Sequence, residues 1–279
     1  MDEGVASSDF DIVSGAAGIL AYLVSIEQAD PTIQRAIAHL LAYLLWLGEP
    51  GQPPGQERWY IPPALLPGEL HRQLAPRGNF NCGLSHGIPG PLAALSLTWL
   101  AGYRSPGLRE TIAYLADWVA EHRIEREWGI DWPDSVPLES ATTARDWQQL
   151  PPTRSAWCYG SPGVARSLWL AGCTLESGTL RRLGEKAIEA ALRRPVRDRA
   201  IPAPTLCHGV AGLLHICLRF AHECASELVK AQIPVLVEQI LATFDPSFPL
   251  GFRDIEQDVL LDQPAWLREA NSGSRRLRS

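Results

Sequence analysis

No stretch of this chain is long and apolar enough to cross a lipid bilayer. The longest apolar run, Ala36 to Leu47, is interrupted by His39, whereas a membrane-spanning helix needs about 20 predominantly apolar residues. The run therefore predicts a buried helix. The N-terminal sequence MDEGVASSDFD is acidic and lacks the positive start and apolar core of a secretory signal. These absences predict a cytoplasmic protein without a transmembrane segment.

The chain also has little positive charge to offer a polyanion. Its formal net charge is −6, whereas binding to nucleic acid requires a basic surface. The basic cluster of Arg275, Arg276 and Arg278 lies at the end of the chain and is interpreted as a solvated terminus. A nucleic-acid partner is therefore not expected.

Cys-x-x-Cys pairs, which are typical of zinc fingers, are absent as well. A reducing cytoplasm disfavours disulfides between the cysteines that are present. Cys173, Cys217 and Cys224 lie in apolar helical patterns and are predicted to be small core residues. Cys158 and Cys207 differ, because each precedes a glycine-containing turn, in WCYGSPG and LCHGVAG.

A glycine-spaced element recurs along the chain. The segments SGAAGIL, SHGIPGPL, CYGSPGVA and CHGVAGLL begin at Ser14, Ser85, Cys158 and Cys207, and each holds two glycines three positions apart. A small or apolar helical run follows each segment. Each G-x-x-G is therefore interpreted as a loop that turns into a helix, where glycine allows special dihedral angles or close backbone approach.

Between these turns the apolar residues recur at three- and four-residue steps, which predicts amphipathic helices, and no convincing alternating strand pattern appears. Pro234 is expected to kink or interrupt the last of these helices. An outer helix, a loop and a glycine-started inner helix, repeated, predict an all-α ring of paired helices. Residues 1–263 are assigned to this domain and residues 264–279 to an irregular basic tail. Residues 251–263 are expected to form a short hairpin or an irregular loop.

Two proline-rich stretches, residues 48–69 and 130–154, each run up to a G-x-x-G turn. Long loops in compact domains are often lids or binding segments. Poorly ordered connections are an equally good interpretation, and the sequence leaves both open.

Cys158, Cys207 and His208 are a soft donor set of the kind that zinc prefers, and they would leave one tetrahedral position open, as in catalytic zinc sites. Their spacing alone is weak evidence, because cysteines beside helix starts are often core residues. Their repeat positions strengthen it, since equivalent positions in a ring converge at one end of its axis. His86 stands directly before Gly87, as His208 stands before Gly209. It is either a capping or core histidine, or a general acid or base that faces the same cavity.

The segments GLSHGIPG, SAWCYGSPG and LCHGVAG, in this order, closely resemble the diagnostic motifs of lanthionine synthetase C-like proteins, the lantibiotic cyclases. DFDIVSGAAGIL is similar to the first motif of that family, and GFRDIEQD resembles a late segment. The resemblance extends from about Asp9 to Gln263. It implies an α/α toroid with zinc at one end, held by Cys158, Cys207 and His208.

The resemblance also implies roles for further residues. His86 matches the proposed acid/base histidine of the family, and Asp11, or alternatively Asp9, matches an acidic residue of its first motif. Arg154 matches an arginine close to the first zinc cysteine. Trp157 and Tyr159 match the aromatic residues of the substrate pocket.

The implied function is zinc-dependent cyclisation. A peptide cysteine thiolate would add to a dehydroalanine or dehydrobutyrine of a dehydrated, lantibiotic-type precursor peptide and form a thioether ring. A dehydratase and a transporter are the further partners that this implies. Two alternatives stay open: intermolecular addition of a thiol such as glutathione to dehydroamino acids, and a catalytically weak zinc-containing scaffold.

The chain departs from the family pattern at both ends. The first motif begins at Asp9, and LDQPAWLREANSGSRRLRS stands where another glycine-started helix would follow. The ring is therefore expected to be incomplete, with apolar helix faces exposed. Another chain or self-association would complete it, or the incomplete ring would be unstable.

Overall fold

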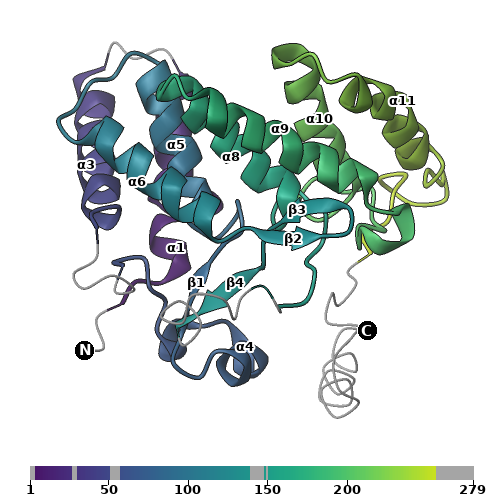
Figure 1. Cartoon of the computed structure of the whole chain (residues 1–279), viewed down its shortest axis with the longest axis horizontal. Coiled ribbons are helices and arrows are strands. Elements are labelled where there is room, and N and C mark those ends of the chain that lie inside the picture. Colours follow the sequence, from purple (N-terminus) through teal and green to yellow (C-terminus); the bar gives the residue numbers. More distant parts are fainter. Residues whose placement is uncertain (1–3, 27–29, 51–56, 139–147, 149, 256–279) are drawn as a thin grey trace.

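The computed structural model describes residues 4–26, 30–50, 57–138, 148 and 150–255, and these are mostly helical (Figure 1). The helices are α1 (Ser7–Phe10), α2 (Ala16–Ser25), α3 (Pro31–Leu47), η1 (Pro63–Leu65), α4 (Gly68–Leu74), α5 (Pro89–Leu100), α6 (Leu108–Glu121), α8 (Ser161–Thr174), α9 (Gly178–Arg193), η3 (Val196–Asp198), α10 (Val210–Glu223) and α11 (Glu227–Leu241). No described helix combines the length and the apolar character needed to span a membrane.

The long apolar run of the sequence forms the second half of α3. Asp30 caps this helix by accepting the backbone N–H of Thr32 at 2.7 Å, and Pro31 occupies the first turn, where its missing N–H costs nothing. The side chains of α3 that are buried recur at helical spacing, at Ile37, Leu41, Leu44 and Leu47. This face anchors α3 on the core.

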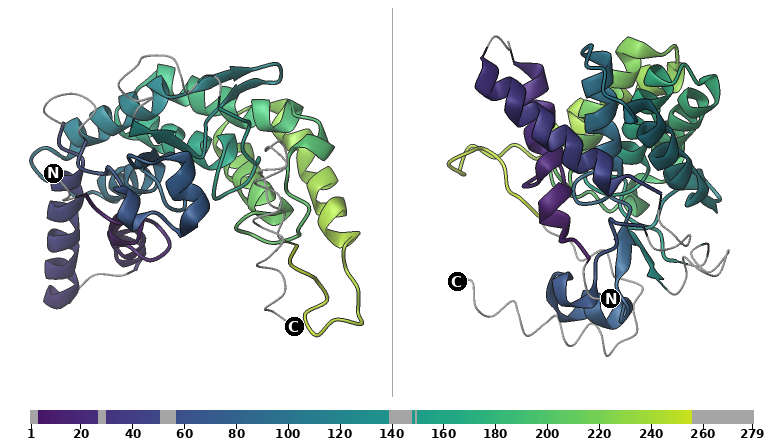
Figure 2. Two further views of the ribbon diagram at one scale, coloured as in Figure 1. Left: turned by 90° about the horizontal axis from the view of Figure 1, so that it is seen from below. Right: turned by 90° about the vertical axis from the view of Figure 1, so that its left-hand side faces the viewer.

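The helices form two layers, as the sequence predicts. The glycine-started helices α2, α5, α8 and α10 are the inner partners of α3, α6, α9 and α11, respectively, and neighbouring inner helices also pack together. In α5 and α8 most residues are buried, whereas α9 buries one face only, which is the difference expected between a core helix and a surface helix. The pairs follow one another around an open arc (Figure 2). The prediction of an all-α, incomplete α/α toroid is confirmed.

Short strands in the loops pair with one another, and the sequence analysis missed these strands. β1 (Asn79–Asn81) pairs antiparallel with β4 (Ser135–Pro137), and β2 (Ile124–Arg126) pairs antiparallel with β3 (Gly129–Asp131). Each strand has three residues, and three residues are too few to show an alternating pattern.

Three further expectations can be compared with the fold. The helix α11 continues through Pro234, so the proline does not interrupt it. Cys217 is buried, and Cys173 and Cys224 pack against the core, as predicted. Residues 251–255 form an irregular segment, whereas the rest of that loop and the tail at 264–279 lie outside the described residues.

The described parts of the two proline-rich stretches are firmly packed. Trp59 in the first stretch and Trp132 in the second are among the largest fully buried side chains. Trp59 contacts Trp118 edge-on, and Trp132 donates its indole N–H to the Val119 carbonyl at 2.7 Å. Both stretches therefore dock on α6. The segments 51–56 and 139–147 lie outside the described residues.

A chain of backbone hydrogen bonds connects the four glycine turns. Ile12 N–H donates to the Ser85 carbonyl at 3.2 Å, Ser85 N–H to the Cys158 carbonyl at 3.2 Å, and Cys158 N–H to the Cys207 carbonyl at 3.1 Å. Each turn thus donates to the next one along the sequence. The ladder brings the residues before each G-x-x-G to one end of the arc, as the repeat predicts.

The second glycine of each later turn packs against an apolar residue of the turn before it. That residue lies three positions before the first glycine of its own turn. A Cβ atom at this glycine would collide with that residue, so close packing of neighbouring turns requires glycine. The pairs are Gly90 with Ile12 Cγ1 (2.8 Å), Gly163 with Leu84 Cβ (2.7 Å) and Gly212 with Trp157 Cβ (2.8 Å), measured from the position that a Cβ would take.

The last turn has an apolar residue at the same position, but no glycine of a following turn packs against it among the described residues. Leu206 occupies the position of Leu84 and Trp157, and its side chain is 56% exposed. At the other end of the arc, Ile19 and Tyr22 of α2 are exposed as well. These are the uncovered faces expected of an incomplete ring. That another chain or a second copy covers them stays a prediction.

The substitution Gly212→Ala is expected to destabilise the protein by about 1–3 kcal/mol, because an inserted methyl group would meet the Leu206 carbonyl and the Trp157 Cβ, neither of which can move freely. Thermal unfolding measures this loss. Gly178→Ala is the matched control, since a Cβ there would contact only the flexible Arg182 side chain. Equal melting temperatures for the two variants would contradict the packing argument.

Candidate active site

Asp11 and His86 form a close polar pair between the first and second turns. The Asp11 Oδ2 atom lies 2.6 Å from His86 Nδ1. Oδ1 accepts the backbone N–H groups of Val13, Ser14 and Gly15 at 2.7–3.0 Å. Asp11 is 1% exposed and His86 is 40% exposed. The carboxylate is therefore fixed by its own turn, and it orients an imidazole whose other nitrogen is available to a ligand.

Cys158, Cys207 and His208 contact one another in sequence. The thiol of Cys158 hydrogen-bonds Cys207, and this bond lowers the pKa of Cys207 to about 5, while burial opposes the shift and His208 and His86 reinforce it. The same bond, together with burial, raises the pKa of Cys158. The shared hydrogen bond therefore favours the thiol form at Cys158 and the thiolate form at Cys207.

His208 is fixed from its other side by Asp254, whose Oδ1 atom lies 2.9 Å from His208 Nε2. Burial alone would lower the pKa of His208, but hydrogen bonds to Cys207 and Asp254 outweigh burial and raise it. In many metal sites a histidine binds the metal ion through one ring nitrogen and a carboxylate through the other.

The donors fit zinc by their chemistry, because two sulfurs and one imidazole nitrogen are typical zinc ligands. Hydrogen bonds hold them against one another rather than around a common point. Accordingly, in the part of the chain that the structure describes, no group of three His, Cys, Asp or Glu residues forms a ready metal site. Cys158, Cys207 and His208 remain the residues that could hold the ion.

The remaining predicted residues lie near the Asp11–His86 pair or near the cysteines. Arg154 is close enough for its charge to lower the pKa of Cys158 in opposition to burial. The ring of Tyr159 lies 6.5 Å from that of His86, centroid to centroid. Trp157 packs on a small apolar cluster of Leu84, Ala93 and Leu170 from α5, α8 and the second turn. Asp9, the alternative to Asp11, instead bonds the N–H of Ala6 within its own helix.

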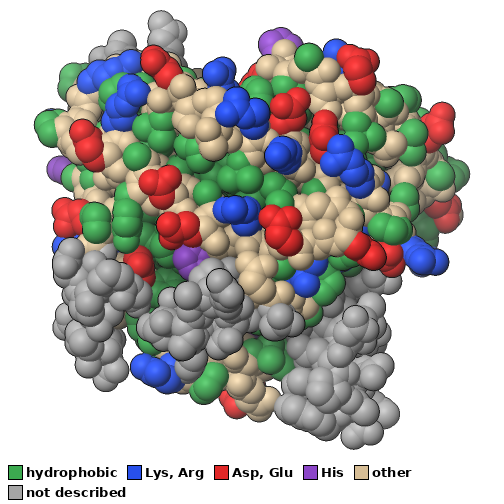
Figure 3. Space-filling model, in the orientation of Figure 1, with side chains coloured by type: hydrophobic (Ala, Val, Ile, Leu, Met, Phe, Trp, Pro, Cys, Tyr) green, Lys and Arg blue, Asp and Glu red, His purple; other side chains and the backbone are tan. Residues whose placement is uncertain are grey.

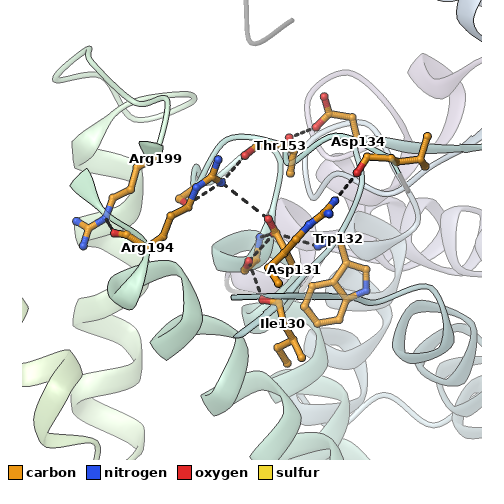
Figure 4. Close-up of polar contacts among 11 residues, drawn as sticks. Ile130, Asp131, Trp132, Asp134, Thr153, Arg194 and Arg199 are labelled. Atoms are coloured by element: carbon orange, nitrogen blue, oxygen red, sulfur yellow. Dashed lines mark hydrogen bonds and ion pairs between the residues drawn. The ribbon is translucent and has the colours of Figure 1, made fainter. Parts of the chain in front are cut away.

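A buried polar network fixes the loop that carries Arg154 and Cys158 (Figure 4). Asp131 accepts hydrogen bonds from Ser161 Oγ at 2.6 Å and from the Ser161 N–H, so it caps α8. Arg194 faces Asp131 at 3.8 Å and donates to the Thr153 carbonyl. The Arg199 carbonyl accepts the Ser155 N–H at 2.8 Å. Residues of β3 and of the segment that follows α9 therefore hold both ends of this loop.

Sequence reasoning missed this network and two neighbouring residues. Asp131 and Arg194 carry no recognisable motif and become partners only through the fold. Asn81 lies two residues before Gly83, where the segment GLSHGIPG begins, and Asp254 belongs to the quoted segment GFRDIEQD. A role for each could have been suspected from these positions.

On the face shown in Figure 3, acidic and basic side chains are interspersed without a continuous basic area.

A helical arc with its glycine turns gathered at one end, beside histidine, aspartate and two cysteines, defines the class of lanthionine synthetase C-like proteins. The chain matches that family over residues 2–258 and belongs to it. It is 26% identical over 255 residues to nisin biosynthesis protein NisC of Lactococcus lactis subsp. lactis, over 90% of this chain and 59% of the relative.

The fold comparison agrees with the sequence comparison. The solved structure of nisin cyclase superposes with a TM-score of 0.77 at 24% identity, covering 90% of this chain and 61% of that one. The chain therefore spans about three fifths of the length of these two relatives.

Proposed function

We propose that this protein is a zinc-dependent cyclase that adds peptide cysteine thiolates to dehydroalanine or dehydrobutyrine and so forms thioether rings in a lantibiotic-type precursor. The observation that carries the proposal is the gathering of Asp11, His86, Cys158, Cys207 and His208 at one end of the arc by the turn-to-turn ladder. Family membership and the likeness to a nisin biosynthesis protein support it.

In this proposal Cys158, Cys207 and His208 hold the zinc ion. When bound, the ion would lower the pKa of a substrate thiol and present it as a thiolate. Asp254 keeps His208 oriented through its bond to Nε2. The buried network behind Thr153 and Ser161 fixes the position of Cys158 between its partners.

The addition step forms a bond between the substrate sulfur and the β-carbon of the dehydroamino acid. The π electrons of the carbon–carbon double bond move toward the carbonyl group and give an enolate. Arg154 stabilises the charge on the enolate oxygen. His86 then gives a proton to the α-carbon, which restores the carbonyl group, and Asp11 holds the imidazole in place for this transfer. The proton that the substrate thiol releases replaces the one that His86 gives, so the addition consumes no net proton.

The partners of the reaction follow from this chemistry. The peptide must reach the protein already dehydrated, so a dehydratase acts before it, and a transporter would act after ring formation. A reducing cytoplasm suits the reaction, because both the substrate thiols and the Cys158–Cys207 pair must stay free of disulfides.

The test uses the zinc-loaded protein and a peptide with one cysteine and one dehydroalanine. Cyclisation removes the free thiol without changing the mass of the peptide, and a peptide with serine in place of dehydroalanine is the control. A mass gain of one glutathione, when glutathione is present, would indicate intermolecular addition instead. Full zinc loading with unchanged thiols would indicate a scaffold and would overturn the proposal.

A further inference from the structure

Tyr159, from the zinc-cysteine turn, is held by residues of the histidine turn. The Asn81 side chain at the end of β1 donates from Nδ2 to the phenolic oxygen of Tyr159 at 3.0 Å. The tyrosine ring packs against Gly83, where a Cβ would come within 2.6 Å of ring atoms Cδ1 and Cε1. Gly83 therefore makes room for the ring, and Asn81 fixes its hydroxyl group.

The orientation of the Asn81 amide follows from its second contact. The backbone N–H of Gly83 donates to Asn81 Oδ1 at 2.9 Å. A backbone N–H can only donate, so the oxygen of the amide must face Gly83 and the nitrogen must face Tyr159. An amide nitrogen also can only donate. The phenolic oxygen of Tyr159 is therefore the acceptor in this pair.

The consequence concerns the hydroxyl proton of Tyr159. Because Asn81 occupies the oxygen as a donor, the O–H is left to donate elsewhere, and none of the described residues accepts it in a hydrogen bond. The Tyr159 ring lies 6.5 Å from that of His86, centroid to centroid, and Tyr159 directly follows Cys158 in the chain, so a substrate held between His86 and the Cys158–Cys207 pair would lie near it.

We infer that Asn81 is a positioning residue that makes Tyr159 a hydrogen-bond donor to the substrate carbonyl oxygen that becomes the enolate oxygen. This inference rests on the proposed function. Tyr159 then acts as a second stabilising group for that oxygen, in addition to Arg154, while His86 delivers the proton to the α-carbon. A donor directed at a developing oxyanion acts mainly on kcat, since its bond strengthens in the transition state.

Asn81→Asp is the sharpest variant, because aspartate has the shape of asparagine but can only accept. One carboxylate oxygen would still accept the Gly83 N–H. The other would accept a hydrogen bond from the Tyr159 hydroxyl group, which could then no longer donate to the substrate. We expect Asn81→Asp and Tyr159→Phe each to lower kcat for cyclisation about 100-fold, the size of effect seen when one oxyanion donor is lost. KM should change much less. The double variant should be no slower than Tyr159→Phe alone, since both changes remove one donor.

Raman spectroscopy of the tyrosine Fermi doublet supplies a readout that does not depend on activity. The difference spectrum between wild type and Tyr159→Phe should show an acceptor-type doublet, and Asn81→Asp should convert it to a donor-type doublet. Tyr60→Phe is the matched control, because the Tyr60 hydroxyl donates to the Arg77 carbonyl and its difference spectrum should be donor-type.

The outcomes separate the inference from the proposed function. An active parent whose Asn81→Asp variant is equally fast, or whose double variant loses the product of the two single losses, overturns the inference and leaves the proposed function standing. A parent that consumes no thiol overturns the proposed function. A donor-type doublet for Tyr159 in the wild type overturns the inference whether or not the parent is active.

Discussion

Replacing Cys207 by alanine is expected to lower zinc affinity by more than about 100-fold, which is the loss that outer partners of metal ligands already cause when removed. The hydrogen bond from Cys158 lowers the pKa of Cys207 to about 5, so Cys207→Ala removes the sulfur that more readily becomes a charged donor. Cys158 would then lose its hydrogen-bond partner, while burial would still raise its pKa. Zinc retained after dialysis against a graded series of chelator concentrations measures the loss.

The fold should survive this substitution, because Cys207 is an exposed residue and contributes little to the core. Cys173→Ala is the matched control: it removes a partly buried thiol from α8, the helix that follows Cys158, and lies outside the site. Wild-type zinc retention is expected for the control, together with an unchanged melting temperature for both variants when all the proteins are compared without zinc. Retention of zinc by Cys207→Ala would show that the ion is held elsewhere.

The sequence predicts the parts of this protein that repeat. The G-x-x-G spacing predicts the inner helices and the gathering of their first residues at one end of the arc. This works because the second glycine of each later turn packs closely against the turn before it. Cys158 and Cys207 meet through a hydrogen bond between their backbones, and their role as zinc ligands stays a prediction. Such contacts are predictable because one geometry is used several times, and a single turn would not have revealed it.

The contacts that do not repeat could not be predicted. Helices α8 and α9 lie between Asp131 and Arg194 in the sequence, and the packing of α9 on α8 and β3 brings the two residues together. Asn81 and Tyr159 likewise meet across neighbouring repeats. A polar residue that pairs over such a distance leaves no periodic pattern, so its role becomes visible only with the fold.

Removing the His86 imidazole should slow cyclisation by about 100- to 10,000-fold, the usual contribution of a positioned general acid. His86→Ala leaves the zinc donors in place, so zinc content should not change. His222→Ala, at the exposed end of α10, removes a histidine remote from the Asp11 contact and is the control. Loss of thiols under single-turnover conditions measures the rate. A His86→Ala variant that retains wild-type activity would exclude this residue as the acid.

Asp11→Asn distinguishes orientation from proton donation. The asparagine oxygen can still accept the N–H groups of Val13, Ser14 and Gly15, so the turn should keep its shape. Its amide nitrogen, however, would donate to His86 Nδ1, where the carboxylate now accepts, and would disfavour the charged imidazolium. We expect a smaller loss of rate than for His86→Ala.

The configuration of the product supplies a second readout for this pair. A fixed general acid delivers its proton to one face of the enolate, whereas solvent can reach both faces. Product formed slowly by His86→Ala should therefore be a mixture at the α-carbon, while Asp11→Asn, which still carries an imidazole, should keep the wild-type preference. A single configuration from His86→Ala would mean that another group, with Tyr159 the nearest candidate, delivers the proton.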